Sequence, residues 1–319
     1  MRESFKFLGI IATLMSLVAC QDLGAKLPKE DGEAKYGDII DYRRSNSPIS
    51  YTTKSKLVNN AKTKSIKDNT DIESDLTIEY YGGVNFDKLY YFVRAKKVES
   101  YNDGKTNEKD EYFLESWKYY KDGYLYEVLN NESKEVEGNA PRKSYTKLAM
   151  DKNLALELLL EEEDIGQLGF DDSMEDYLIT KGNEIDHSSA SYWNIDVSKG
   201  NNKSSLEYYS KGGEGNLSAV IKESGTFKTE AISKKENVPE NTPNLSLFKY
   251  SSNFSFTFEK YHYGNFVVNY NVQLKDINGI EIGMQKASLN EKVMKGCTVS
   301  YPKLDDYQEV TEIKGLLPF

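Results

Sequence analysis

Apolar and polar side chains alternate every second residue through much of this chain. Leu89, Tyr91 and Val93 fall on one side of their segment, whereas Arg94 and Lys96 fall on the other. Successive side chains of a β-strand point to opposite faces, so this period is typical of a strand with one buried and one hydrated face. We therefore predict a strand through this segment.

Similar segments recur and are separated by turn sequences. Alternation is sharpest at 254–258 and 266–274, and residues 278–279 (Asn-Gly) form a hairpin turn signal. Residues 102–104 and 121–123 also end in glycine and favour tight turns. Further strands are predicted at 177–186, 191–198, 204–210, 216–223 and 226–233. The order of strands and turns predicts an antiparallel β-meander.

Two segments have the spacing of a helix. The stronger is 152–165, which Asp151 can cap and whose apolar face consists of Leu154, Leu158, Leu159 and Ile165. A shorter helix is predicted over 51–63, with a thin apolar stripe at Leu57, Val58 and Ala61. The fold class expected from these patterns is mainly β (α+β), with one or two helices.

The first twenty residues have the layout of a bacterial lipoprotein signal. A basic start is followed by the apolar stretch 7–17, and the segment closes with Leu17, Val18, Ala19 and Cys20. The stretch is about half of the ~20 apolar residues that span a bilayer, which favours a cleaved signal over a transmembrane helix. An ordinary secretory signal with a coincidental cysteine is the alternative.

A lipoprotein signal predicts that residues 1–19 are removed and that the sulfur of Cys20 carries diacylglycerol, with a further acyl chain such as palmitate. Leu17, Val18 and Ala19 are then the cleavage recognition residues. Two or three acyl chains give lasting attachment to a membrane. We therefore expect a protein on the extracytoplasmic face of a cell membrane, which in a Gram-positive source is the cell surface.

Proline, glycine and polar residues suggest how the rest of the chain is divided. Residues 20–50 are polar and contain four glycine or proline breaks before 38, which predicts a lipidated flexible tether with a reach of about 30 Å. Two prolines within 237–244 indicate a linker, because proline cannot donate to a sheet. The expected domains are a β domain at 51–245 and a β-rich C-terminal extension at 246–319, which either extends the first sheet or forms a small separate unit.

Composition and charge limit the classes of molecule that this chain is expected to bind. The chain has 319 residues and a formal net charge of -10, which argues against nucleic acid and against broad electrostatic adhesion to anionic lipid. Of two cysteines, acylation uses Cys20 and leaves Cys297, so no intramolecular disulfide is expected. Without a basic cluster or a second cysteine nearby, Cys297 is predicted to be a buried structural thiol.

The sequence offers little for catalysis. His187 and His262 are its two histidines, both in predicted turns, and the sequence has no G-x-S-x-G nucleophile motif. The acidic runs 161–164 and 171–176 lack the alternating ligand spacing and glycine of a calcium loop. We predict no catalytic residue, no metal ligand and no cofactor, and hence a protein that is not an enzyme.

Between residues 51 and 245 the order of elements resembles the LolA and LppX-like superfamily of lipoprotein and lipid carriers. The segments that carry the resemblance are KLVNNAKT, KSIKDNTDIESDLTIEYYGG, WKYYKDGYLYEVL, LALELLLEEEDIGQL and NLSAVIKESGTFKTE. The resemblance implies a curved antiparallel sheet or incomplete barrel, whose concave side is closed by helices and holds acyl chains or another apolar ligand. It implies no catalytic residues.

A curved sheet with few helices does not fill its own hollow, and such hollows are lined by apolar side chains. The candidate lining residues are Leu89, Tyr91, Val93, Tyr124, Tyr126, Trp193 and Ile195. The alternative is that these side chains form a dry, packed core. The expected function is to bind, or to hand over, a lipid or other apolar ligand near the membrane.

A second hypothesis is a surface interaction or adhesion module that uses exposed tyrosine-rich sheet faces. The adjacent pairs that suggest it are Tyr80-Tyr81, Tyr90-Tyr91, Tyr119-Tyr120 and Tyr208-Tyr209. Neighbours in a strand point to opposite faces, so each pair is expected to place one ring in the core and one on the surface.

Overall fold

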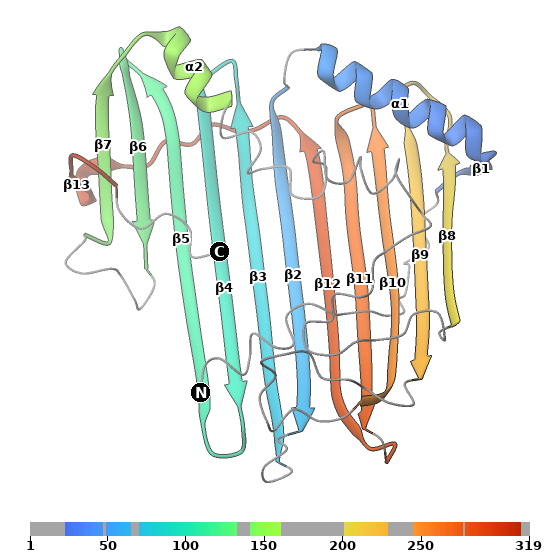
Figure 1. Ribbon diagram of the computed structural model, residues 1–319. Coiled ribbons are helices and arrows are strands. Elements are labelled where there is room, and N and C mark those ends of the chain that lie inside the picture. Colours follow the sequence, from blue (N-terminus) through green and yellow to red (C-terminus); the bar gives the residue numbers. More distant parts are fainter. Residues whose placement is uncertain are drawn as a thin grey trace, which may run out of the picture.

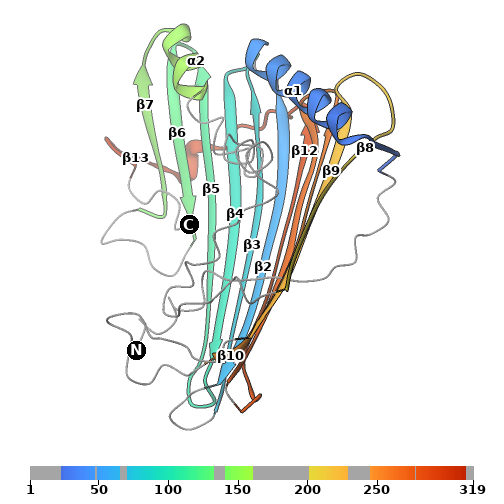
Figure 2. The same cartoon turned by 45° about the vertical axis from the view of Figure 1, so that its right-hand side comes forward.

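The fold is one large, open, curved sheet with helices on one face. The computed structural model describes residues 23–46, 49–64, 70–132, 141–160, 201–228, 245–276 and 278–313. Thirteen strands form the sheet, which does not close into a barrel, and two α-helices lie across the same end of it (Figures 1 and 2). This confirms the predicted fold class. The predicted strands 177–186 and 191–198 lie outside the described residues.

The helices are α1 (Lys29–Ser45), α2 (Lys152–Leu160) and the short 3-10 helix η5 (Leu304–Asp306). The strands are β1 (Ala25–Leu27), β2 (Tyr51–Lys64), β3 (Asp71–Asn85), β4 (Tyr90–Asn102), β5 (Asn107–Lys121), β6 (Tyr124–Asn131), β7 (Lys143–Ala149), β8 (Asn201–Ser210), β9 (Leu217–Lys228), β10 (Leu245–Glu259), β11 (Tyr263–Asp276), β12 (Glu281–Lys295) and β13 (Gln308–Glu309).

Two meanders meet at the centre of the sheet. The strand order is β1-β8-β9-β10-β11-β12-β2-β3-β4-β5-β6-β7-β13, antiparallel throughout except for β13 on β7. The pairing of β12 with β2 runs from Gly283↔Thr63 to Lys295↔Tyr51 and joins the halves. Of the two possibilities for the β-rich C-terminal extension, the strands extend the first sheet, because β10, β11 and β12 lie inside it.

The helix predicted over residues 51–63 is wrong, since β2 occupies this segment. In this strand the lysines, rather than the few apolar residues, follow the two-residue period of a β-strand. Lys54, Lys56 and Lys62 share one face. On that face Lys56 Nζ lies 2.5 Å from a Glu79 carboxylate oxygen, and Lys62 Nζ lies 2.7 Å from one of Glu73. Cross-strand ion pairs of this kind stabilise strand pairing modestly.

The predicted tether is also partly wrong, because α1 lies within residues 20–50. Pro28 precedes the first turn, where Glu30 and Asp31 complement the positive end of the helix dipole. Tyr36 and Ile39, three residues apart, are both buried against the sheet. Burial of two such side chains contributes about 3–6 kcal/mol, which offsets the cost of the two helix glycines.

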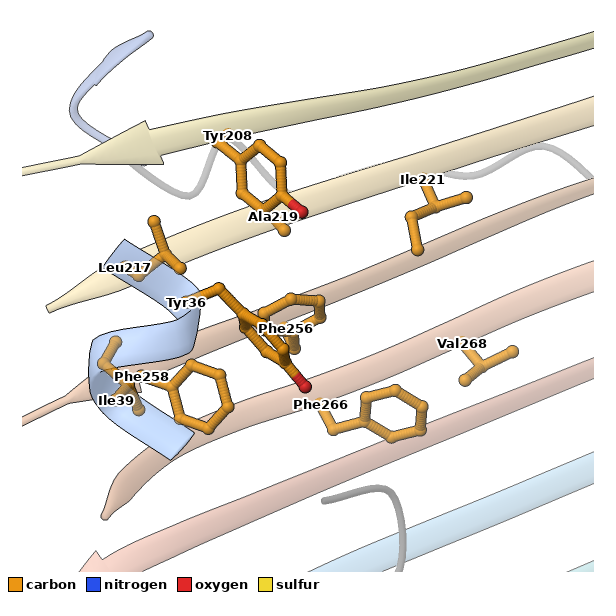
Figure 3. Close-up of a cluster of buried hydrophobic side chains, with 10 residues drawn as sticks. All are labelled: Tyr36, Ile39, Tyr208, Leu217, Ala219, Ile221, Phe256, Phe258, Phe266 and Val268. Carbon is orange, nitrogen blue, oxygen red and sulfur yellow. The ribbon is translucent and has the colours of Figure 1, made fainter. Parts of the chain in front are cut away.

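Both helices pack on one face of the sheet, called here the helix face. Figure 3 shows Tyr36 and Ile39 of α1 over strands β8 to β11. Ala155 and Leu159 of α2 pack against Val93 and other residues near the β4–β6 end. The register connects the two clusters, since residues directly opposite one another across paired strands share a face.

The opposite face is wet over much of β2 and β3 but is covered near α2's end of the sheet. There Val299, Leu304 and Tyr307 pack against a cluster that contains Tyr90 and Cys297. As a result Tyr90 and its neighbour Tyr91 are both buried, on opposite faces. The rule of one core and one surface ring therefore fails for this tyrosine pair, because the sheet here is covered on both sides.

Substitutions at the two glycines of α1 test how this helix packs on the sheet. A Cβ at Gly32 would lie 2.3 Å from Cγ of the buried Tyr208 ring, whereas a Cβ at Gly37 would meet nothing within 4 Å. Gly32→Ala should lower the free energy of unfolding by about 1–3 kcal/mol, because the helix must shift. Gly37→Ala should raise it by about 0.5–1 kcal/mol. Thermal unfolding measures both, and equal effects would contradict the described docking of α1.

Candidate functional site

The most unusual group on the helix face is the carboxyl of Glu291. Glu291 lies on β12 between Phe266 of β11 and Ser55 of β2, and only 1% of it is exposed. Its Oε1 atom has no hydrogen-bond partner. Burial raises the pKa of this carboxyl from its ordinary 4.5 to about 8. The side chain is therefore mostly a neutral acid at pH 7.

A second unsatisfied polar atom lies beside it. Thr53, 1% exposed, lies two residues before Ser55 on the same face of β2 and is paired with Val293. Its Oγ1 is buried and has no hydrogen-bond partner. Diagonal neighbours across antiparallel strands lie about 7 Å apart, so Thr53 and Glu291 present two hydrogen-bonding groups to one region. Native folds leave few such groups, because each costs about 1–3 kcal/mol.

Next to Glu291, toward the end of the sheet away from the helices, an unbroken line of apolar side chains crosses seven strands. This apolar row consists of paired residues from β8, β9, β10, β11, β12, β2 and β3: Leu206, Ile221, Phe254, Val268, Leu289, Leu57 and Ile78. Five of its members are partly exposed, and Ile221 and Val268 are buried. At the usual strand spacing the row is about 29 Å long.

The structure separates the predicted lining residues. Leu89, Tyr91 and Val93 are buried beneath α2 on the helix face, as a packed core would have them. Tyr124 and Tyr126 lie on the opposite face, where Tyr126 packs against the cluster around Tyr90 and Cys297. The two groups therefore do not line one hollow. The reason is that Leu125, not its neighbours, points toward α2.

The remaining predicted lining residues, Trp193 and Ile195, lie outside the described residues, and so does His187. The same holds for the signal residues Leu17, Val18 and Ala19 and for Cys20. Cys297 is buried, as predicted, and burial raises the pKa of its thiol to about 11, which makes it a poor nucleophile. His262 lies at the β10–β11 turn, where burial and Arg43 lower its pKa.

Within the described segments, the histidines, cysteines and acidic residues form no group of three or more that could hold a metal ion. None of the helices described is both long and apolar enough to cross a membrane.

The opposite face exposes tyrosines near its covered corner. Tyr124 is 36% exposed and Tyr301 is 40% exposed. The ammonium groups of Lys147 and Lys121 lie 4.2 Å and 5.5 Å from the centroids of these two rings. Cation–π contacts of this kind contribute about 0.5–1 kcal/mol at exposed sites. The patch is an amphipathic surface of aromatic and basic side chains.

Comparisons with known proteins leave the family open. No protein-family model and no curated protein matches the chain. Among solved structures, the chain is similar to the translocator domain of autotransporter NalP from Neisseria meningitidis, with 6% identity, 86% of this chain and 100% of that chain covered, and a TM-score of 0.21. It is also similar to an outer membrane channel from Pseudomonas putida F1, with 9% identity, coverage of 78% and 97%, and a TM-score of 0.21. These TM-scores are too low to support an argument.

Sequence reasoning missed Glu291 for a physical reason. The apolar residues of β12 change sides along the strand: Ile282 and Met284 lie on the opposite face, whereas Leu289 and Val293 lie on the helix face. The strand therefore has no continuous period of two. The available signal was an acid placed midway between Leu289 and Val293, at an apolar position of the pattern.

Glu291 makes folding stability depend on pH. The pKa of Glu291 in the folded state lies above the ordinary value, so protonation of this carboxyl favours the folded state. This contribution to stability is complete below about pH 4.5 and is lost as the pH rises toward 8. The loss should approach about 1.4 kcal/mol per pH unit. Glu291→Gln should remove this component and raise the free energy of unfolding at pH 8. Urea unfolding at pH 5 and pH 8 measures it, and an unchanged pH dependence in the variant would contradict the assignment.

Proposed function

We propose that this chain is a non-enzymatic, lipid-anchored extracytoplasmic protein that binds an apolar ligand on its helix face. The observation that carries the proposal is the apolar row, which crosses seven strands and keeps five partly exposed members. An apolar surface of this length would ordinarily be covered in a protein exposed to water. A lipid acyl chain is a suitable occupant, because it is apolar, long and narrow.

The predicted anchor at Cys20 places this surface near its source of ligand. A lipidated N-terminus keeps the sheet close to one membrane, so exchange with that membrane or with a neighbouring protein is favoured over free shuttling. The resemblance to LolA and LppX-like carriers suggests the same role and stays a prediction.

Substitutions at two neighbouring residues of β2 test which face of the sheet binds the ligand. Leu57 belongs to the apolar row, whereas Val58 is partly exposed on the opposite face. In a lipid-free chain of residues 20–319 with Cys20→Ser, Leu57→Asn should weaken binding of the neutral fluorescent probe Nile red about tenfold, because a polar side chain interrupts the row. Val58→Asn should leave binding unchanged.

Circular dichroism checks that both variants keep the fold. Absence of probe binding by the parent chain would reject the proposal, and equal losses in the two variants would show that the helix face is not the site.

The anchor itself can be tested in bacteria. Cells that express the full chain should incorporate an alkyne-labelled palmitate into the protein, because acylation accompanies processing at the cysteine. Cys20→Ala should lose the label and leave the chain with its signal uncleaved, whereas Cys297→Ala, at a buried thiol, should keep the label. A labelled Cys20→Ala protein would contradict the predicted anchor.

The exposed tyrosines favour a second candidate function, a surface interaction or adhesion module. Tyr124 and Tyr301, with Lys147 and Lys121 over their rings, offer amphipathic side chains of the kind enriched in protein interfaces. This function would use the opposite face, so substitutions in the apolar row distinguish it from ligand binding.

A further inference from the structure

We propose that the ligand of the helix face is an apolar amine, whose ammonium group binds Glu291 and Thr53 while its apolar chain lies along the apolar row. This inference rests on the proposed function and adds the chemistry of the polar group. It follows from the coincidence of two unsatisfied buried oxygens with the longest apolar line on the same face.

The two oxygens match the donors of an ammonium group. An ammonium has three N–H donors and no acceptor, and both Glu291 Oε1 and Thr53 Oγ1 can accept. Ionised Glu291 would also supply the opposite charge, and charge-assisted hydrogen bonds are about twice as strong as neutral ones. An ammonium placed on the helix face over the paired strands β12 and β2 would therefore satisfy both atoms.

The immediate neighbours of Glu291 do not suit an anionic group. On the helix face the residues paired with it, next to it along β12 and diagonal to it are Phe266, Ser55, Leu289, Val293, Gly264, Val268, Thr53 and Leu57. This set contains no basic side chain. Among these strand neighbours a phosphate or carboxylate head group would therefore find no cation, and it would face the charge of Glu291 when that carboxyl ionises.

The apolar row gives the ligand a route to the carboxyl. Leu289 precedes Glu291 by two residues on the same face of β12 and pairs with Leu57, and both leucines are partly exposed. A chain lying on the part of the row from β8 to β12 therefore ends at Leu289, one residue pair from the carboxyl.

Binding in this way is linked to pH. The ammonium needs Glu291 as a carboxylate, and the free protein holds it mostly neutral below pH 8. Complex formation therefore releases one proton, from the carboxyl to solvent. The affinity should rise about tenfold from pH 6 to pH 7 and about fivefold more to pH 8, then level off.

Two tyrosines of β11 on the helix face, Tyr263 and Tyr270, have their pKa raised by burial above the ordinary value of 10, outside that window. Glu223 of β9 is a further buried acid of this face, and a control variant tests it below. His262, at the β10–β11 turn, has its pKa lowered by burial and by Arg43 and is mostly neutral above pH 7.

Competition between matched compounds tests the inference. Decylamine and 1-decanol share one chain, and each is titrated against Nile red bound to the lipid-free chain of residues 20–319 at pH 6, 7 and 8. Decylamine should bind at least tenfold more tightly than decanol at pH 8, and only decylamine should show the rise with pH. Glu291→Gln should bind both compounds equally and without pH dependence.

Glu223→Gln is the matched control, because Glu223 is also a buried acid of the helix face, on β9, and accepts a hydrogen bond from Ser252. This variant should behave as the parent chain does. Equal binding of amine and alcohol by the parent chain would overturn the inference while leaving the proposed function intact. Loss of the pH dependence in Glu223→Gln would overturn the assignment to Glu291, and absence of Nile red binding would overturn both proposals.

Discussion

The backbone pairing of β12 with β2 is the constraint on which the rest of the structure depends. It joins residues more than 200 positions apart, from Gly283↔Thr63 to Lys295↔Tyr51, and makes one sheet from two meanders. Without it each meander would expose a long unpaired edge, which invites association with other chains. Because side chains alternate, this register also decides that Glu291 and Ser55 face the helices and that the lysines of β2 face water.

The two faces of the sheet follow from that register. On the helix face, α1 and α2 cover one end of the strands, and the apolar row lies beyond α1 and beside Glu291. On the opposite face, ion pairs such as Arg94 with Glu115 cover the surface at little energetic gain, and the segment after Cys297 packs over one corner. The apolar face is therefore the one suited to a ligand, and the ionic face is suited to solvent.

Local patterns predicted much of this fold. The alternation at 89–96 and 266–274, the Asn278-Gly279 turn and a helix at 152–160 were predicted correctly, because each depends on neighbours within about ten residues. The predicted apolar face of that helix was wrong at Leu154, which is 49% exposed. The helix α1 was missed because Gly32 and Gly37 suggested flexibility, and its stability comes from packing on distant strands. The partner strand of β2 and the two-sided burial near Tyr90 likewise depend on contacts that no local pattern contains.

The central claim is that an apolar ligand occupies the helix face, and photo-crosslinking tests it most directly. A long-chain alkyl diazirine is bound to the lipid-free chain, irradiated, and located by peptide mass spectrometry. If the ligand occupies the helix face, adducts should form on residues of β12, β2 and β3 on that face, including Leu289, Leu57 or Ile78, and they should be lost when excess unlabelled ligand is present. Adducts confined to the opposite face, or spread evenly over both faces and insensitive to competitor, would contradict it.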